Sequence, residues 1–150
     1  MVKKGQLTID FLFAFTLVIL TVLNLIYLSG MNYSHSQTLD VSARLSAFAT
    51  DLQNTVARVY SSGNGYSAIV FAPLNLSGSD RIVVVLDNVT NRIVISAVIG
   101  GSNYTVIRKS PVPLYVRSEE TLNATKKSLW VVARLNPLEG QLYVEVKPTP

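Results

Sequence analysis

The chain has 150 residues, of which 49% are hydrophobic and 15% are charged, and its formal net charge is +4. That length accommodates one domain of ordinary size together with a membrane anchor. Lys3 and Lys4 supply two of the positive charges, and the other basic residues are too scattered to indicate a nucleic-acid partner. The absence of cysteine excludes disulfide bonds, thiol nucleophiles and thiolate metal sites.

An almost unbroken apolar run extends from Leu7 to Leu28, shortly after the two lysines. A helix of 22 residues is about 33 Å long, which is enough to cross the hydrocarbon core of a bilayer. Because the lysines precede the run, the positive-inside rule predicts a cytoplasmic N-terminus and an exported remainder. Asp10 lies inside the run, where an unpaired charge costs roughly 3 kcal/mol at mid-bilayer and less near the interface.

Three kinds of N-terminal segment compete as explanations of this run. A cleaved secretory signal has a shorter hydrophobic core and a cleavage site between small residues, for which Ser29-Gly30 is a poor candidate. A plain signal anchor fits the length but leaves Asp10 unexplained. A prepilin-type segment, cut on the cytoplasmic side of the membrane, accounts for the carboxylate and is the interpretation that we favour.

The residues Lys4-Gly5-Gln6-Leu7-Thr8-Ile9-Asp10 resemble the archaeal class III signal peptide, a variant of the type IV prepilin leader. That family has Lys-Gly-Gln, then Ser or a similar residue at the third mature position, Glu at the fifth, and a hydrophobic run. This chain has Thr8 and Asp10 at those two positions, and Ala14 where a leucine is often found. The resemblance covers only the N-terminal segment. It implies that a prepilin peptidase cuts between Gly5 and Gln6.

Cleavage there would create a free α-amino group at Gln6, about 6 Å along the helix from Asp10. In a bundle of staggered identical helices, the ammonium of one subunit can meet the carboxylate of another in a low-dielectric core. Such a pair adds little net stability, but breaking it is expensive, so the pair fixes the register of the subunits. In a solitary anchor, Asp10 would instead extend to the lipid headgroups.

A long N-terminal helix is predicted, with a membrane half in residues 6–30 and an amphipathic half in residues 31–62 that continues to the head. Gly30 is the position at which this helix could soften or end. The helix is expected to end near Tyr60, where a stretch rich in Ser, Gly and Asn begins. Its apolar face consists of Val41, Leu45, Phe48, Leu52, Val56 and Val59. We expect this face to pack on the head rather than form a coiled-coil seam, because fewer than four heptads are present.

Residues 63–150 are predicted to form an antiparallel β head, a small sandwich or a twisted sheet, so the expected fold class is α+β. Two hairpins are expected, one around Asn88-Val89-Thr90-Asn91 and one around residues 136–140. Glu119 and Glu120 are expected to decorate a loop. The expected strands are Ser67–Ala72, Arg81–Asp87, Arg92–Ile99, Tyr104–Lys109, Leu114–Arg117, Leu129–Leu135 and Gln141–Lys147.

Five Asn-X-Ser/Thr sequons begin at Asn32, Asn75, Asn88, Asn103 and Asn123. Four of them fall in the expected head, where acceptors of an exported glycoprotein lie, and the loops at Asn88 and Asn75 look most exposed. The competing explanation is that asparagine favours turns.

The sequence offers no constellation typical of an enzyme, and we expect no cofactor or metal. His35 is the only histidine, and no phosphate-binding or nucleophile-elbow motif occurs. The basic residues Lys126-Lys127, Arg108-Lys109 and Arg117 could meet a polyanion, but solvated strand faces are the favoured explanation.

These observations together predict a structural subunit of an archaeal type IV pilus-like filament, with a head that serves adhesion. It would be made as a membrane precursor and then polymerise with copies of itself outside the cell. The resemblance implies a prepilin peptidase, an assembly ATPase and a platform protein as partners, and surface glycans are a further candidate. Two alternatives remain open: a single-pass anchored ligand-binding module, and a minor pilin of an uptake or secretion apparatus.

Overall fold

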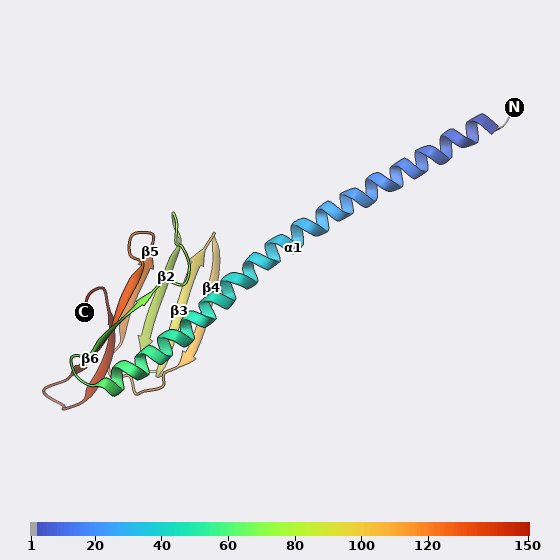
Figure 1. Ribbon diagram of the computed structural model, residues 1–150. Coiled ribbons are helices and arrows are strands. Elements are labelled where there is room, and N and C mark those ends of the chain that lie inside the picture. The colour runs from blue at the N-terminus through green and yellow to red at the C-terminus, as the bar shows by residue number, and fades with distance from the viewer. Residues whose placement is uncertain (1–2) are drawn as a thin grey trace. The chain divides into compact units, whose positions relative to one another are not determined.

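The computed structural model describes the backbone of residues 3–150 and the side chains of residues 9–30 and 39–150. The chain divides into two compact units, Met1–Asp40 and Val41–Pro150, which are described separately. We call Val41–Pro150 the head unit. It contains the C-terminal part of the helix and all seven strands (Figure 1).

A single 60-residue helix, α1 (Lys3–Ser62), occupies the first unit and enters the head unit. It continues through Gly30, so the predicted long N-terminal helix is confirmed. One glycine costs a helix only about 1 kcal/mol relative to alanine, which is too little to end a helix of 60 residues. The helix ends at Ser62, close to the predicted Tyr60. Gly63 and Gly65 follow with φ angles of 89° and 84°, a conformation that glycine adopts without strain.

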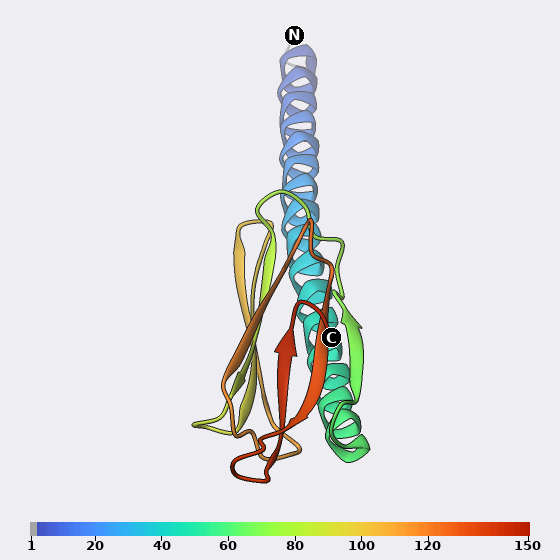
Figure 2. The ribbon, with the colours of Figure 1, turned by 90° about the vertical axis from the view of Figure 1, so that its left-hand side faces the viewer.

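The seven strands form two antiparallel sheets, with strand orders β1-β6-β7 and β4-β3-β2-β5. Figure 2 shows the four-stranded sheet on one side of the head unit and β6, β7 and β1 on the other, with α1 running alongside. The α+β fold class is therefore confirmed. The strands are β1 (Ser67–Phe71), β2 (Arg81–Asp87), β3 (Arg92–Ile99), β4 (Ser102–Lys109), β5 (Ser118–Asn123), β6 (Ser128–Leu135) and β7 (Leu142–Lys147).

One expected strand is wrong: residues Leu114–Arg117 belong to a connection, and the strand begins at Ser118. Pro111 and Pro113 disfavour strand pairing just before this point. The backbone N–H of Leu114 instead donates to Oδ1 of Asn91, at 2.8 Å. Glu119 and Glu120, which were expected in a loop, lie in β5 opposite Val85 and Val84 of β2.

The core of the head unit lies between α1 and the inner faces of the two sheets. Alternate residues of β2 point inward, and Ile82, Val84 and Leu86 are fully buried, as strand geometry requires. The predicted helix face packs against them, with Val41 partly buried at its start. Its buried members are Leu45, Phe48, Leu52, Val56 and Val59. The prediction that this face packs on the head is confirmed.

Polar contacts close the head unit on two sides. On one side, the backbone N–H of Val146 in β7 donates to Oγ of Ser118 in β5, at 3.0 Å, and joins the edges of the two sheets. On the other side, Arg108 of β4 donates to Oγ of Ser46 in α1 at 2.7 Å. Gln53 of α1 also donates to the carbonyl oxygen of Lys109, at 2.9 Å. Residues 41–62 of α1 are therefore an integral element of the head unit.

Two carboxylates organise turns in the head unit. Asp80 accepts hydrogen bonds from the backbone N–H of Gly100 at 2.9 Å and of Ser77 at 3.1 Å, so it connects the β1–β2 loop to the β3–β4 turn. These donors lower the pKa of Asp80 below its ordinary value of 3.8. In the β2–β3 turn, the hydroxyl of Thr90 and the backbone N–H of Val89 lower the pKa of Asp87 in the same way.

Leu52→Ala should lower the free energy of unfolding of the head by about 2–5 kcal/mol, because Leu52 is fully buried in the core. Leu39→Ala is the matched control, since Leu39 is 64% exposed in the same helix. Its expected effect is within about 0.5 kcal/mol. Chemical unfolding of the two variants in detergent measures both values. Equal destabilisation by the two substitutions would contradict the proposed core.

Acid should destabilise the head through Asp80. A carboxylate whose pKa is lower in the folded than in the unfolded state adds stability at neutral pH, and this stability is lost as the pH falls through the folded pKa, below 3.8. Asp80→Asn should therefore be less stable at pH 7 and lose less stability on acidification. Thermal unfolding between pH 7 and pH 2 tests this. Parallel curves for the variant and the original chain would show that Asp80 does not contribute.

Candidate assembly segment and surface sites

Residues Ile9–Gly30 of α1 form a stretch that is long and apolar enough to cross a membrane. None of this 22-residue stretch is buried against the rest of the described chain. Phe11 and Phe13, for example, are 71% and 70% exposed. Soluble monomers rarely expose a contiguous apolar surface of this kind. We call Ile9–Gly30 the apolar span, and its surface has to be covered by lipid or by other protein.

Asp10 is exposed near the N-terminal end of the apolar span. Within residues 9–30 and 39–150, no side chain forms a hydrogen bond or an ion pair with its carboxylate. The predicted cleavage residues Lys4, Gly5 and Gln6 belong to the first turns of α1, but their side chains lie outside the described residues. In a regular helix, Gln6 precedes Asp10 by about one turn. The proposed ammonium and the carboxylate therefore lie on the same side of the helix.

Three other polar side chains of the apolar span form hydrogen bonds within the helix. The hydroxyls of Thr16 and Thr21 each donate to the carbonyl oxygen four residues earlier, at 2.8 Å. Asn24 donates from Nδ2 to the carbonyl oxygen of Leu20 at 3.1 Å. Its own side-chain oxygen accepts no hydrogen bond from the described residues. Asp10 and Asn24 thus keep polar capacity left over, as do the hydroxyls of Tyr27 and Ser29 near the C-terminal end of the span.

The surface of the apolar span is uneven, with projecting aromatic rings on one face and a hollow on another. Phe11 and Phe15 stack one helical turn apart, with ring centroids separated by 6.3 Å. On another face, a hollow of about 330 Å³ is lined by Ile9, Leu12, Phe13 and Thr16. Projections and hollows of this kind are what neighbouring helices interlock with.

The four sequons of the head unit differ in how their asparagines are used. Asn75, in the β1–β2 loop, is exposed and accepts a hydrogen bond from Lys127 Nζ at 3.3 Å. Asn103, in β4, is also exposed. Asn88 donates from Nδ2, the atom that a glycan would occupy, to the carbonyl oxygen of Tyr115 at 3.3 Å. Asn32 lies in α1, but its side chain is outside the described residues.

Asn123 has a structural task that its sequon does not reveal. It ends β5, and its Oδ1 accepts three hydrogen bonds, from the backbone N–H and hydroxyl of Thr125 and from the backbone N–H of Lys126. These bonds shape the turn between β5 and β6. The sequon at Asn123 is therefore explained in part by turn formation, the alternative raised by the sequence.

Four of the five basic residues that could have met a polyanion have side-chain partners within the head unit. Lys126 is ion-paired with Glu120, and Arg117 lies 3.6 Å from Glu119. Arg108 and Lys127 bond to Ser46 and Asn75, as described above. These contacts favour the explanation that the cations stabilise strand surfaces.

The outer face of the sheet β1-β6-β7 carries exposed apolar side chains. Ile69 and Phe71 of β1 are 39% and 64% exposed, and Trp130 of β6 is the register partner of Ile69. Farther along this face, Arg134 and Lys147 lie 3.1 Å and 2.6 Å from Oε1 of Glu145, although neither contact has hydrogen-bond geometry.

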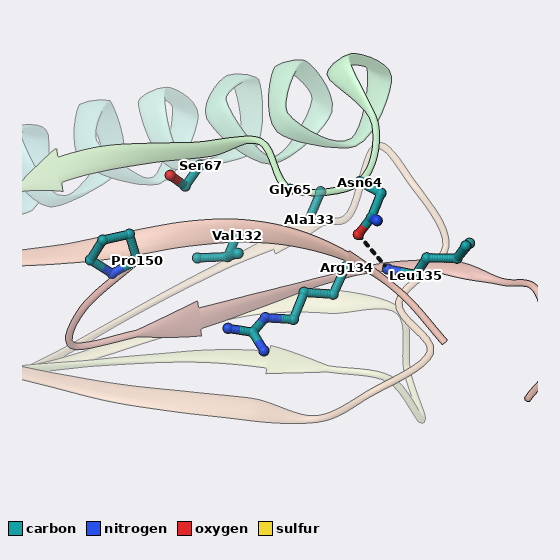
Figure 3. A pocket seen from close by; sticks show the side chains of 8 residues that line it. All are labelled: Asn64, Gly65, Ser67, Val132, Ala133, Arg134, Leu135 and Pro150. Atoms are coloured by element: carbon teal, nitrogen blue, oxygen red, sulfur yellow. Dashed lines mark hydrogen bonds between the residues drawn. The ribbon is translucent and has the colours of Figure 1, made fainter. Parts of the chain in front are cut away.

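A hollow of about 430 Å³ lies at the Arg134 end of this face (Figure 3). Asn64 closes it on one side by accepting a hydrogen bond from the backbone N–H of Leu135 at 2.9 Å, and Pro150 lies on the other side. Among the described residues, no three His, Cys, Asp or Glu side chains come together to hold a metal ion, and His35 lies outside the described side chains.

Asn123→Ala should lower the free energy of unfolding by about 1–3 kcal/mol, because it leaves the turn donors without their acceptor. Asn103→Ala removes a sequon from an exposed strand position and should change stability by less than about 0.5 kcal/mol. Unfolding of the non-glycosylated protein measures both effects. If Asn123→Ala proved as mild as Asn103→Ala, the structural role given to Asn123 would be wrong.

Comparisons of the chain with protein-family models, with curated proteins and with solved structures found no match.

Proposed function

We propose that this protein is a structural subunit of an archaeal type IV pilus-like surface filament. In this proposal the precursor is anchored in the membrane by the apolar span and cut between Gly5 and Gln6. The subunits then polymerise through their N-terminal helices. The observation that carries the proposal is the apolar span itself, which is unburied, bears Asp10 and follows a class III-type motif.

The physical argument starts from what must cover the apolar span. In the precursor, lipid covers it, and the cost of Asp10 is kept moderate because Asp10 lies near the end of the span. In a filament, the helices of other copies replace the lipid. The ammonium of Gln6 on one copy then neutralises Asp10 on another, and contacts between different surfaces of identical subunits propagate a helical polymer.

The head unit would form the outside of the filament and make the adhesive contacts. Its core is complete without the apolar span, so it can fold before and after polymerisation. The exposed Ile69 and Phe71 give the outer face of β1-β6-β7 an apolar contact area. Glycans on Asn75 and Asn103 would add a further surface.

The apolar outer face also gives some support to the alternative of an anchored ligand-binding module. In that case the protein would keep its whole N-terminus and remain in the membrane as a solitary anchor. Determination of the mature N-terminus separates the two functions: Gln6 is expected for the pilin-like subunit, whereas Met1 or Val2 would exclude it. A minor pilin would share the Gln6 start but be scarce in sheared filaments.

Asp10→Ala should leave cleavage after Gly5 intact but reduce filament formation strongly, because the Gln6 ammonium loses its counter-charge. Asp10→Glu, which keeps the charge, is the matched control and should retain filaments. Electron microscopy of sheared surface material, together with the N-terminal sequence of the cell-associated protein, measures both steps. Filaments of normal number and length from Asp10→Ala would refute the role of the carboxylate.

A further inference from the structure

One face of the apolar span differs from the rest of its circumference. Ala14, Leu17, Thr21, Asn24 and Leu28 recur at alternating spacings of three and four residues. At about 100° per residue, these five positions fall within a sector of about 80°. We call them the seam. Asp10 lies on the same face at the cytoplasmic end, whereas Thr16, the other threonine among the described residues of the span, lies about 80° or more away from every seam position.

The seam has the properties of a helix–helix contact in lipid. Such contacts favour small side chains that let two backbones approach, and polar side chains that bond across the interface. Ala14 is the only alanine of the apolar span, and the hydroxyl of Thr21 is already bonded within its own helix. All three described phenylalanines of the span, Phe11, Phe13 and Phe15, fall outside the sector.

Asn24 indicates which partner the seam fits. Its side-chain oxygen and one of its two amide hydrogens have no partner among the described residues, since only one Nδ2–H bond, to Leu20, is formed. An amide both donates and accepts, so the natural complement of Asn24 is a second Asn24 at the same depth. A spacing that averages 3.5 residues is also the one that keeps two helices in contact along a left-handed supercoil.

We propose that two copies of this chain pair in the membrane through the seam, with Asn24 bonded to Asn24 across a parallel helix pair. The inference rests on the proposed function for the placement of the span in a membrane, and it adds an assembly step before polymerisation. In the uncleaved pair, two Asp10 carboxylates repel each other at the headgroup level. After cleavage, the Gln6 ammonium groups supply counter-charges, so the cleaved pair is the tighter one.

Disulfide cross-linking of the full chain in its own membranes tests the seam. Because the chain has no cysteine, each variant carries a single reactive thiol. Leu17→Cys places the thiol on the seam, and Ile19→Cys places it on the opposite face about 3 Å away in depth. Mild oxidation should convert Leu17→Cys to a covalent dimer far more completely than Ile19→Cys. Equal dimer yields would mean random collision and would overturn the proposal.

Asn24→Leu in the Leu17→Cys background tests the amide pair. Loss of an interhelical hydrogen bond should lower the dimerisation constant about 3- to 30-fold. Thr16→Leu in the same background is the control, because it removes a polar side chain from the apolar span at a position outside the seam. It should leave the dimer yield unchanged. An unchanged yield with Asn24→Leu, or an equal loss with Thr16→Leu, would refute the role of Asn24.

Alkaline extraction of the same membranes distinguishes the two levels of the proposal. If the chain is extracted as a soluble protein, both the membrane placement and the seam are wrong. If it stays in the membrane and starts at Gln6, but shows no seam-specific dimer, the proposed function survives and the seam alone is overturned.

Discussion

Water has to be excluded from the side chains of Ile9–Gly30, and no other described part of the chain does so. Burial of a single large apolar side chain contributes about 1.5–3 kcal/mol, and this span exposes more than a dozen of them. The coverage must therefore come from lipid or from other protein chains. Everything proposed for this protein follows from that requirement, because a helix with such a surface has no stable place in water.

The carboxylate of Asp10 and the amide of Asn24 determine whether lipid or protein covers the apolar span better. Lipid satisfies the apolar side chains but offers nothing to Asp10 or to the free oxygen of Asn24. A second copy of the same helix offers an amide to Asn24 and, after cleavage, an ammonium to Asp10. Polar groups that lipid leaves unsatisfied thus favour contacts between copies, and they do so at defined positions along the helix.

The head unit has the opposite character, because its core is closed within the chain. The helix α1 has an all-round apolar surface along Ile9–Gly30 and a single apolar face from Val41 onward, and that face packs against the inner faces of the sheets. Hydrogen bonds from Arg108 and Gln53 fasten it to β4. The apolar span therefore has to be covered by lipid or by other protein chains, whereas the head unit buries its own core.

Much of this organisation was predictable from the sequence, because it depends on local periodicity. The face from Val41 to Val59 and the hairpin of β2 and β3 follow from helical and alternating patterns. Strand β5 was missed because Ser118–Asn123 is almost entirely polar and contains one core residue, Leu122. Its conformation is set by pairing with β2, a contact between distant segments. The hydrogen bonds of Asn91 and Asn123 also leave no periodic signal in the sequence. Asn91 bonds to the distant residue Leu114, and Asn123 bonds to residues of its own turn.

At the candidate site, Asp10 stands out in the sequence because a carboxylate in an apolar run conflicts with its surroundings. The seam is less visible, because its residues are mostly ordinary ones and only their helical phase and the hydrogen bonds of Thr21 and Asn24 bring them together. The sequence predicts that the helix needs partners. The helix geometry indicates that the seam is the face that contacts a second copy of the chain.

The most direct test of the account is electron microscopy of surface filaments sheared from cells that produce this chain, with mass spectrometry of the filament subunit. The account predicts filaments whose main or minor subunit is this protein with an N-terminal peptide that begins at Gln6. Recovery of the protein only from membranes, with residues 1–5 intact and no filaments that contain it, would contradict the account.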